Sequence, residues 1–231
     1  MKDYEFSDNK ILQSWHKNAG EWVNVIDRAA IPSRELITNR AIIEAILAHN
    51  PTNVLDVGCG EGWLARNLAA KNIDVYGIDA VAELITEAQH RSGNYQQFLT
   101  TSYEDLDTKA LGQKFDLVVC NFSLIGESAT EVFFQKAGSL LNPGGHLLVQ
   151  TLHPLISCGE QDYTDGWRPG TWEGIEGNFE EAAPWYFRTI SSWVDLFTQN
   201  NLVLLSLKEP LNPTTGLPAS LILCGRLTTT L

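Results

Sequence analysis

Two hydrophobic periods alternate along the chain. Short runs of β-branched and apolar residues are separated by stretches in which apolar residues recur every three or four positions. The first period predicts strands over residues 53–57, 73–78, 95–99, 115–120 and 146–152. The second predicts helices over residues 35–49, 63–70, 81–90 and 127–141. Strands that alternate with helices and are apolar on both faces are typical of a parallel sheet covered by helices on both sides.

The alternation breaks after residue 152. Residues 153–188 are rich in Gly, Pro, acidic and aromatic residues and show no clear period. A helix is then predicted over 190–199, and strands over 202–207 and 219–226. Because Pro and Gly dominate the link between these two strands, we expect the last strand to run antiparallel to its neighbour. The prediction is a seven-stranded, mostly parallel α/β sheet.

The pattern favours one domain of 231 residues with an insertion. Its parts are N-terminal helices over 1–50, a core over 51–152, a cap over 153–188, and a C-terminal helix and strands over 189–231. Trp15 and Trp22 are seven residues apart. This spacing places both indoles on one face of a helix, where we expect them to pack on an apolar surface.

Composition excludes several classes of partner. Acidic residues number 28 and basic residues 16, for a formal charge of −12, and Lys and Arg are scattered singly. A nucleic-acid partner is therefore not expected, because phosphate backbones are bound by basic stripes. No apolar run reaches the roughly 18 residues of a membrane span, and the N-terminus lacks a signal-peptide pattern. Four cysteines without CxxC or zinc-like spacing favour reduced thiols, so we expect a soluble, cytoplasmic protein without a metal or a membrane partner.

A glycine-rich loop follows the first strand of the core. The run Gly58-Cys59-Gly60-Glu61-Gly62 lies between that strand and a helix, and Asp79 ends the second strand 19 residues after Gly60. Ligands of open α/β sheets bind beyond the carboxyl ends of the strands, where glycine lets them approach the backbone. A carboxylate at the position of Asp79 can accept two hydrogen bonds from a ribose diol. Together the two features predict a nucleoside site.

The loop spacing separates two cofactor classes. A dinucleotide site requires G-x-G-x-x-G, but Trp63 occupies the position of the third glycine. No tyrosine is followed by lysine four residues later, as a short-chain dehydrogenase would require. The spacing from Asp56 to Gly62, D-x-G-x-G-x-G, instead resembles the first motif of class I S-adenosylmethionine-dependent methyltransferases, which have a Rossmann-like sheet.

The resemblance extends over residues 54–152 and implies roles for single residues. Asp79 is expected to bind both ribose hydroxyls, Glu104 or Asp105 to meet the adenine amino group, and Tyr103 to lie alongside the adenine ring. Asp56 is expected to order the glycine loop by accepting backbone amides. The cofactor contacts implied by the resemblance are Arg34, Asp56, Gly58, Cys59, Gly60, Asp79, Ala80, Tyr103, Glu104, Asn121 and Phe122. Arg34 is assigned to the methionine carboxylate; a solvated arginine at a helix start is the alternative.

The acceptor class follows from motifs that are missing and from one that is present. Asn121-Phe122-Ser123 departs from the D/N-P-P-Y/F motif of DNA amino-methyltransferases, and neither a paired-glutamate loop nor a catechol-type metal site is found. The chain resembles the small-molecule branch, which includes quinone-biosynthesis methyltransferases. The stretch Trp15-x-x-x-Ala19-x-x-Trp22 looks like the lid helix that precedes the core in some of these enzymes.

Two groups of residues are candidates for the chemistry. His153, at the end of the fifth strand, can act as a general base toward a hydroxyl or amine, or can hydrogen-bond the cap backbone. The cap carries seven aromatic residues and seven acids in 36 positions. Aromatic walls can bind an acceptor and exclude water, or they can anchor the segment on the sheet. The candidate acceptor contacts are Trp15, Tyr163, Trp167, Trp185 and Tyr186.

Four other residues are candidates for a role near the site. Arg188 follows the cap and is expected to pin it to an acid, with a substrate carboxylate as the alternative. His16, beside Trp15, would enter the active site with the lid helix; the alternative is that it lies outside the site. Cys59 and Cys120 are interpreted as small buried fillers, since neither has a neighbouring histidine.

The predicted reaction transfers methyl from S-adenosylmethionine to oxygen, nitrogen or carbon of a small-molecule acceptor and releases S-adenosylhomocysteine. One alternative is a non-catalytic S-adenosylmethionine-binding sensor or scaffold subunit. The other is a nicotinamide-dependent oxidoreductase on the same sheet. Neither composition nor pattern specifies an oligomeric state.

Overall fold

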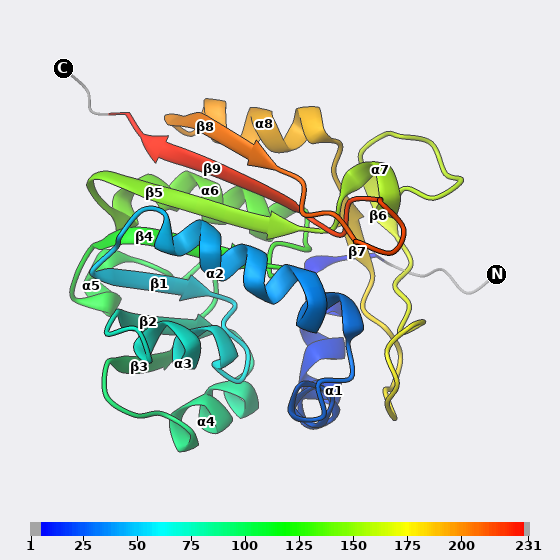
Figure 1. Cartoon of the computed structure of the whole chain (residues 1–231), viewed down its shortest axis with the longest axis horizontal. Coiled ribbons are helices and arrows are strands. Elements are labelled where there is room, and N and C mark those ends of the chain that lie inside the picture. The colour runs from blue at the N-terminus through cyan, green and yellow to red at the C-terminus, as the bar shows by residue number, and fades with distance from the viewer. Residues whose placement is uncertain (1–5, 229–231) are drawn as a thin grey trace.

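The computed structural model describes residues 6–228 of the chain. Over that range the main sheet has seven strands in the order β3-β2-β1-β4-β5-β9-β8 (Figure 1). The strands are β1 (Asn53–Val57), β2 (Asp74–Asp79), β3 (Gln96–Thr100), β4 (Phe115–Asn121), β5 (Leu141–Thr151), β8 (Leu202–Lys208) and β9 (Leu221–Leu227). β9 runs antiparallel to both of its neighbours, and the other pairings are parallel. The predicted α/β sheet with an antiparallel last strand is confirmed.

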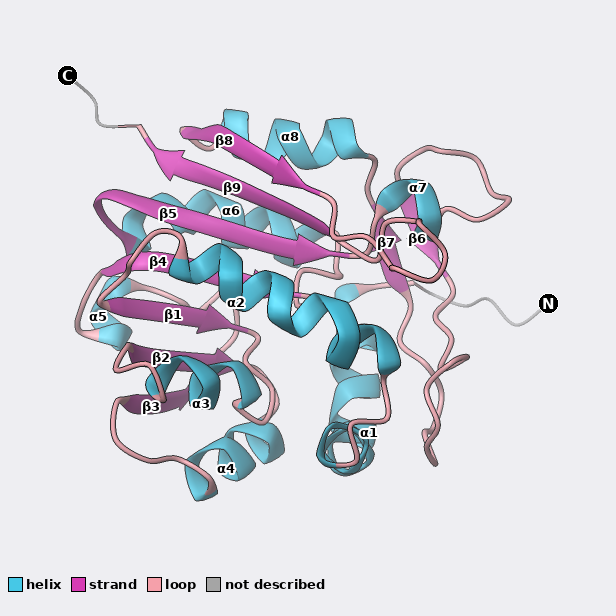
Figure 2. Cartoon of the chain, in the orientation of Figure 1, coloured by secondary structure: helices cyan, strands magenta, loops and turns pink. Residues whose placement is uncertain are grey.

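Helices cover both faces of this sheet (Figure 2). One face packs against α2 (Asn39–Leu47), α3 (Trp63–Ala69) and α4 (Ala82–His90), and the other against α5 (Thr108–Leu111), α6 (Ser128–Leu140) and α8 (Ile190–Gln199). In β1, Val54 belongs to one buried cluster and Leu55 and Val57 to the other. This two-sided burial explains why the strands read as continuous apolar runs.

Most predicted boundaries lie within two residues of the observed ones, and two segments differ in more than this. β5 begins at Leu141 instead of residue 146, because residues 142–145 form a bulge within the strand: Phe115 pairs with Leu141, and Leu117 with His146. A Cβ at Gly145 would lie 2.9 Å from the Asn142 carbonyl oxygen, so this bulge requires glycine. The helix predicted over 35–49 is divided into a π-helical turn, η1 (Arg34–Thr38), and α2.

The N-terminal helix, α1 (Asp8–Asp27), lies across the carboxyl ends of the strands (Figure 1). Its two indoles, Trp15 and Trp22, contact edge to face with centroids 5.1 Å apart, and they pack with Ala19 against Val81 and Leu84 at the start of α4. The expectation of one apolar helix face formed by both tryptophans is confirmed.

One carboxylate fixes the start of α1 to the start of α6. Asp8 accepts hydrogen bonds from the Glu127 amide through Oδ1 (2.9 Å) and from the Ala129 amide through Oδ2 (3.2 Å). It thus caps free amides at a helix N-terminus from 119 residues away. A side chain at Gly126 would collide with it, since a Cβ there would lie 2.0 Å from Asp8 Oδ1.

We expect Asp8→Ala to lower the free energy of unfolding by about 1–2 kcal/mol, because two amides at the positive end of α6 lose their acceptor. Urea denaturation followed by circular dichroism measures the change. Asp195→Ala, on the exposed side of α8 and without a side-chain partner in the described part of the chain, is the matched control and should have little effect. Equal stability of the two variants would contradict the capping role.

The cap, residues 153–188, contains structure that the sequence pattern did not predict. It begins with a helical turn, α7 (Pro154–Ser157), and includes a two-stranded antiparallel ribbon of β6 (Gly166–Arg168) and β7 (Trp185–Phe187). The loop between these strands is bonded to α1. The Glu180 amide donates to Asn18 Oδ1 at 2.7 Å, and the Asn178 amide donates to Glu21 Oε1 at 2.9 Å. In the other direction, the Ser14 hydroxyl donates to the Glu181 carbonyl at 2.8 Å. α1 and the cap loop therefore form one cover beyond the strand ends.

Candidate functional site

A cavity of about 630 Å³ lies between the carboxyl ends of β1, β2 and β4 and this cover. Its volume is within the range of about 300–1,000 Å³ that is usual for small-molecule sites. The strand ends contribute Gly58, Cys59, Gly60, Asp79, Ala80, Asn121 and Phe122 to its wall. The cover contributes Ile11, Leu12, Trp15, Trp22, Trp172, Ile175, Trp185 and Tyr186. One side of the cavity is thus backbone and polar, and the other is largely aromatic.

The glycine loop is held against β2 by its own amides. The Gly58 and Cys59 amides donate to the Ile78 carbonyl at 2.8 and 2.9 Å. Gly58 has a φ of +72°, and a Cβ there would lie 2.3 Å from Ser123 Cβ, so only glycine fits this turn. At Gly60 the nearest atom to such a Cβ is 3.8 Å away, on Trp22. The loop is therefore packed on one side and open toward the cavity on the other.

Asp79 connects this loop to the start of α4. Its Oδ2 accepts from the Gly60 amide and its Oδ1 from the Val81 amide, both at 2.9 Å. Burial raises the pKa of this carboxyl, and the amide hydrogen bonds oppose that shift. Each carboxylate oxygen retains acceptor capacity for a further donor at the cavity wall. This geometry suits a pair of vicinal hydroxyls.

Asp56 does not have its expected contacts. It is buried, does not border the cavity, and its Oδ2 has no hydrogen-bond partner among residues 6–228. The loop amides that it was expected to hold are already bonded to Ile78 and Asp79. Burial, together with the nearby Asp79 and Glu61, raises the pKa of Asp56 to about 8. Asp56 is therefore a protonated carboxyl at neutral pH, and the prediction that it accepts hydrogen bonds from the loop amides is wrong.

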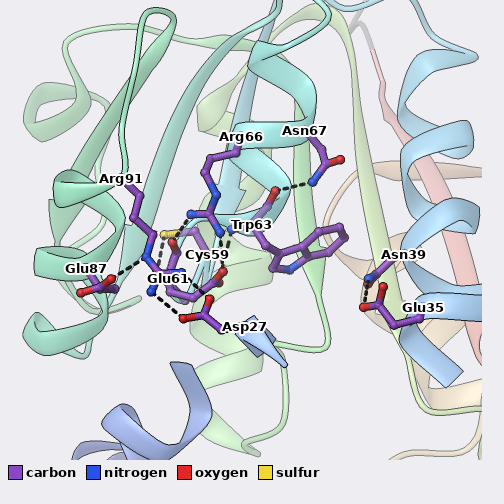
Figure 3. Close-up of polar contacts among 11 residues, drawn as sticks. Asp27, Glu35, Asn39, Cys59, Glu61, Trp63, Arg66, Asn67, Glu87 and Arg91 are labelled. Carbon is purple, nitrogen blue, oxygen red and sulfur yellow. Dashed lines mark hydrogen bonds and ion pairs between the residues drawn. The ribbon is translucent and has the colours of Figure 1, made fainter. Parts of the chain in front are cut away.

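Glu61 orders the far side of the loop, a role that the sequence analysis missed. It is fully buried, and its Oε1 forms an ion pair with Arg66 at 2.6 Å, while Arg66 also donates to the Glu61 carbonyl (Figure 3). The Trp63 amide donates to Glu61 Oε2 at 3.3 Å. Glu61 and Arg66 are five residues apart, across a loop and the start of a helix. Ion pairs within helices have spacings of three or four residues, so the sequence pattern did not indicate this pair.

Arg34 borders the cavity between two indole rings. Its guanidinium carbon lies 5.5 Å from the Trp22 ring centroid and 5.0 Å from that of Trp63. Burial lowers its pKa, although the group stays cationic. Within the described range its guanidinium makes no hydrogen bond and no ion pair. An oriented cation without a counterion is suited to binding an anionic ligand group.

The end of β4 forms a strained turn into the cavity. Phe122 has a φ of +54°, which is rare for an aromatic residue, and its amide donates to the Gln150 carbonyl at 2.8 Å. The neighbouring Asn121 Oδ1 is buried without a partner in the described structure. The Tyr103 hydroxyl donates to the Ser123 carbonyl at 3.1 Å, which places its ring beside the glycine loop. Glu104 borders the cavity nearby, whereas Asp105 does not and bonds Ser102 instead.

His153 lies away from the cavity. Its ring is 2% exposed, and its Nε2 lies 2.7 Å from Glu209 Oε1, while Nδ1 has no partner among the described residues. This placement speaks for a structural role, but the partner is the Glu209 carboxylate in the link between β8 and β9 and not the cap backbone that the sequence alternative named. His16 is likewise outside the cavity, 3.3 Å from Glu83 on α4. Cys59 and Cys120 are buried, and burial raises the pKa of both thiols, as expected of fillers.

The cap aromatics divide into two groups. Trp185 and Tyr186 border the cavity with Trp15. Tyr163 and Trp167 do not: the Tyr163 hydroxyl accepts from the Ile190 amide (2.9 Å), and the Trp167 indole donates to Glu127 Oε2 (2.9 Å). These two rings anchor the cap, which was the alternative interpretation. The wall position instead belongs to Trp172, which contacts Trp15 at 5.9 Å and stacks on Phe179 at 4.1 Å.

Polar contacts between α1 and α4 support this wall. Arg91, after α4, forms a two-pronged ion pair with Asp27 at the end of α1, with nitrogen–oxygen distances of 2.6 and 2.9 Å (Figure 3). The hydrogen bond from Arg91 lowers the pKa of Asp27.

No helix within residues 6–228 is long and apolar enough to cross a lipid bilayer.

Comparison with known proteins gives one family. A family model described as a methyltransferase domain matches residues 14–207. The chain is 32% identical over 146 residues to an uncharacterized methyltransferase of Mycobacterium bovis, covering 62% of this chain and 73% of that one. It is 34% identical over 114 residues to a ubiquinone biosynthesis O-methyltransferase of Xanthomonas axonopodis pv. citri, covering 48% of this chain and 47% of that one.

Among solved structures, the fold resembles magnesium protoporphyrin IX methyltransferase of Synechocystis with bound S-adenosylhomocysteine. The TM-score is 0.65 at 18% identity, and the match covers 96% of this chain and 100% of that one.

Proposed function

Because this chain belongs to the methyltransferase-domain family and is a class I S-adenosylmethionine-dependent methyltransferase, we propose that the cavity beyond the strand ends holds the cofactor and a small-molecule acceptor together. The observation that carries the proposal is the two-sided wall. The glycine loop and Asp79 form one side, and the aromatic cover forms the other. The family match also removes the reason to keep the nicotinamide alternative, which rested on the shared sheet alone.

The cofactor-binding residues are assigned by chemistry. Asp79 accepts from the ribose hydroxyls, and the open face at Gly60 lets the ligand approach the backbone. Arg34 matches the methionine carboxylate, and the unpartnered Asn121 Oδ1 suits an ammonium donor at the same end. Glu104 is the candidate acceptor for the adenine amino group. These donors and acceptors fit the three polar parts of S-adenosylmethionine.

Bound S-adenosylmethionine supplies an electrophilic methyl group on a sulfonium ion. The protein orients the acceptor and excludes water, which is the main source of rate for an in-line displacement. Trp15, Trp172, Trp185 and Tyr186 provide apolar walls for this purpose. We leave His153 out of the reaction, because it lies outside the cavity and is bonded to Glu209.

A small-molecule acceptor is supported by the named relatives, an O-methyltransferase of ubiquinone biosynthesis and a magnesium protoporphyrin IX methyltransferase. We further propose a reducing, cytoplasmic compartment, in keeping with four unpaired cysteines. The net charge of −12 supports the absence of a nucleic-acid partner.

Arg34→Met should weaken S-adenosylhomocysteine binding roughly 10- to 100-fold, because a charged hydrogen-bonded pair contributes about 1.5–3 kcal/mol. Isothermal titration calorimetry measures the affinity. Arg40→Met, six residues later and exposed with Glu44 as its partner, is the matched control and should bind normally. If both variants bind as the native protein does, the methionine carboxylate is not held by Arg34.

Catalysis itself is tested by mass-spectrometric detection of methylated product. A panel of hydroxylated aromatics, amines and activated-carbon compounds is incubated with the protein and S-adenosylmethionine. Product above the protein-free rate supports the enzyme. Tight cofactor binding with no product across the panel would favour the sensor or scaffold alternative.

A further inference from the structure

Arg188, directly after β7, is a buried cation at the acceptor side of the cavity. Its side chain borders the cavity, yet the residue is only 4% exposed. The guanidinium carbon lies 4.7 Å from the Tyr186 ring centroid and 5.6 Å from that of Trp193. Two aromatic rings therefore fix its position and remove it from solvent.

The guanidinium of Arg188 forms no ion pair within the described chain. Its Nη1 donates to the Gly126 carbonyl and its Nη2 to the Glu127 carbonyl, both at 2.8 Å. These bonds use two of the five N–H donors of a guanidinium. No carboxylate of the described residues lies within ion-pair distance. The sequence predicts an acid as the partner of Arg188, and two backbone carbonyls take its place.

Three carboxylates act on Arg188 through space without forming an ion pair with it, and two of them also accept hydrogen bonds from other groups. The Glu127 carboxylate accepts from the Trp167 indole, and Asp165 accepts from the Thr189 amide at 2.8 Å. Glu131, on α6, acts on Arg188 only through space. Burying a cation without an ion-pair partner is unfavourable, so its retention beside a cavity points to an anion supplied by a ligand.

S-adenosylmethionine carries only one carboxylate. In the proposed function Arg34 binds that group from the glycine-loop side, between Trp22 and Trp63. Arg188 contacts other elements, namely the start of α6, β7 and α8. Two cations without an ion-pair partner among residues 6–228 thus border one cavity, and the single carboxylate of the cofactor can pair with only one of them.

We propose that Arg188 binds a carboxylate of the acceptor, so that the enzyme methylates small aromatic acids. Trp185 and Tyr186 provide the apolar contact for the ring, and the remaining N–H donors of Arg188 bind the acid. This inference rests on the proposed function and adds the acceptor class to it.

The test compares acids with their amides on protein saturated with S-adenosylhomocysteine. The probes are 4-hydroxybenzoate and 1-naphthoate against 4-hydroxybenzamide and 1-naphthamide, with affinities from calorimetry and tryptophan fluorescence. Each acid should bind at least tenfold more tightly than its amide. Arg188→Gln should abolish the preference and Arg188→Lys should retain part of it, while both keep the native affinity for S-adenosylhomocysteine.

Arg168→Gln is the matched control. Arg168 is also a cap arginine over an aromatic ring, 5.1 Å from the Phe187 centroid, but it does not border the cavity. This variant should keep the acid preference.

Four outcomes would overturn the inference: equal binding of acid and amide, no acid binding up to the solubility limit, a preference that survives in Arg188→Gln, or lost S-adenosylhomocysteine affinity in a folded Arg188→Lys protein. The last would assign Arg188 to the cofactor. If Arg188→Gln does not fold, the native protein and Arg188→Lys still decide. Failure of the native protein to bind S-adenosylhomocysteine would instead contradict the proposed function itself.

Discussion

Asp79→Asn is expected to weaken S-adenosylhomocysteine binding by about 100-fold or more. The carboxylate is assigned two hydrogen bonds from the ribose, each contributing about 1.5–3 kcal/mol when the acceptor is charged. The variant also replaces one oxygen by an amino group, which then faces the amide of Gly60 or Val81 instead of accepting from it. Both effects reduce affinity, and calorimetry measures their sum.

The matched control for this variant is on the same strand. Asp74 begins β2 at the opposite end and is exposed, so Asp74→Asn removes the same charge far from the cavity. It should bind the ligand normally. Native affinity in Asp79→Asn, with the fold intact, would show that the ribose lies elsewhere.

Asp56→Asn should raise stability at alkaline pH. The folded protein has a pKa of about 8 at Asp56 against 3.8 for the ordinary group, so between these values the folded state holds a proton that the unfolded state has released. Folding stability therefore falls as pH rises through this window. The asparagine variant avoids this loss, and its free energy of unfolding should exceed that of the native protein by roughly 2 kcal/mol or more at pH 8.

Urea denaturation from pH 4 to pH 8 tests this expectation. The difference should be smallest near pH 4 and grow with pH. Asp116→Asn provides a comparison of opposite sign, because hydrogen bonds from Thr52 and Asn142 lower the pKa of Asp116. That variant should be less stable at neutral pH and approach the native protein as pH falls. A flat difference for Asp56→Asn would contradict its burial as a neutral acid.

The sheet could be predicted from sequence because both of its faces are buried. Continuous apolar strands such as β1 and β4, and the glycine at position 58, can be recognised from the local sequence pattern. The division of η1 from α2 and the bulge in β5 depend on neighbouring strands and helices. The spacing of hydrophobic residues along the sequence therefore did not predict them.

The polar half of the candidate site was better predicted than the aromatic half. Asp79, Gly60 and Arg34 border the cavity as expected. In the cap, Tyr163 and Trp167 face anchoring groups while Trp172 takes the wall position, because contacts to α1, α6 and α8 decide which ring faces inward. Trp172 meets α1 far away in the sequence, Trp167 lies on the unpredicted β6, and Tyr163 bonds the first amide of α8. Composition therefore indicated an aromatic wall but not which residues form it.

Calorimetric titration of the native protein with S-adenosylmethionine, S-adenosylhomocysteine and NADH tests the central claim most directly. We expect both adenosyl ligands to bind at a single site and NADH not to bind, with the affinity for S-adenosylhomocysteine reduced in Asp79→Asn and retained in Asp74→Asn. Binding of NADH, or of neither adenosyl ligand, would contradict the assignment of the glycine loop and Asp79 to the methyl donor.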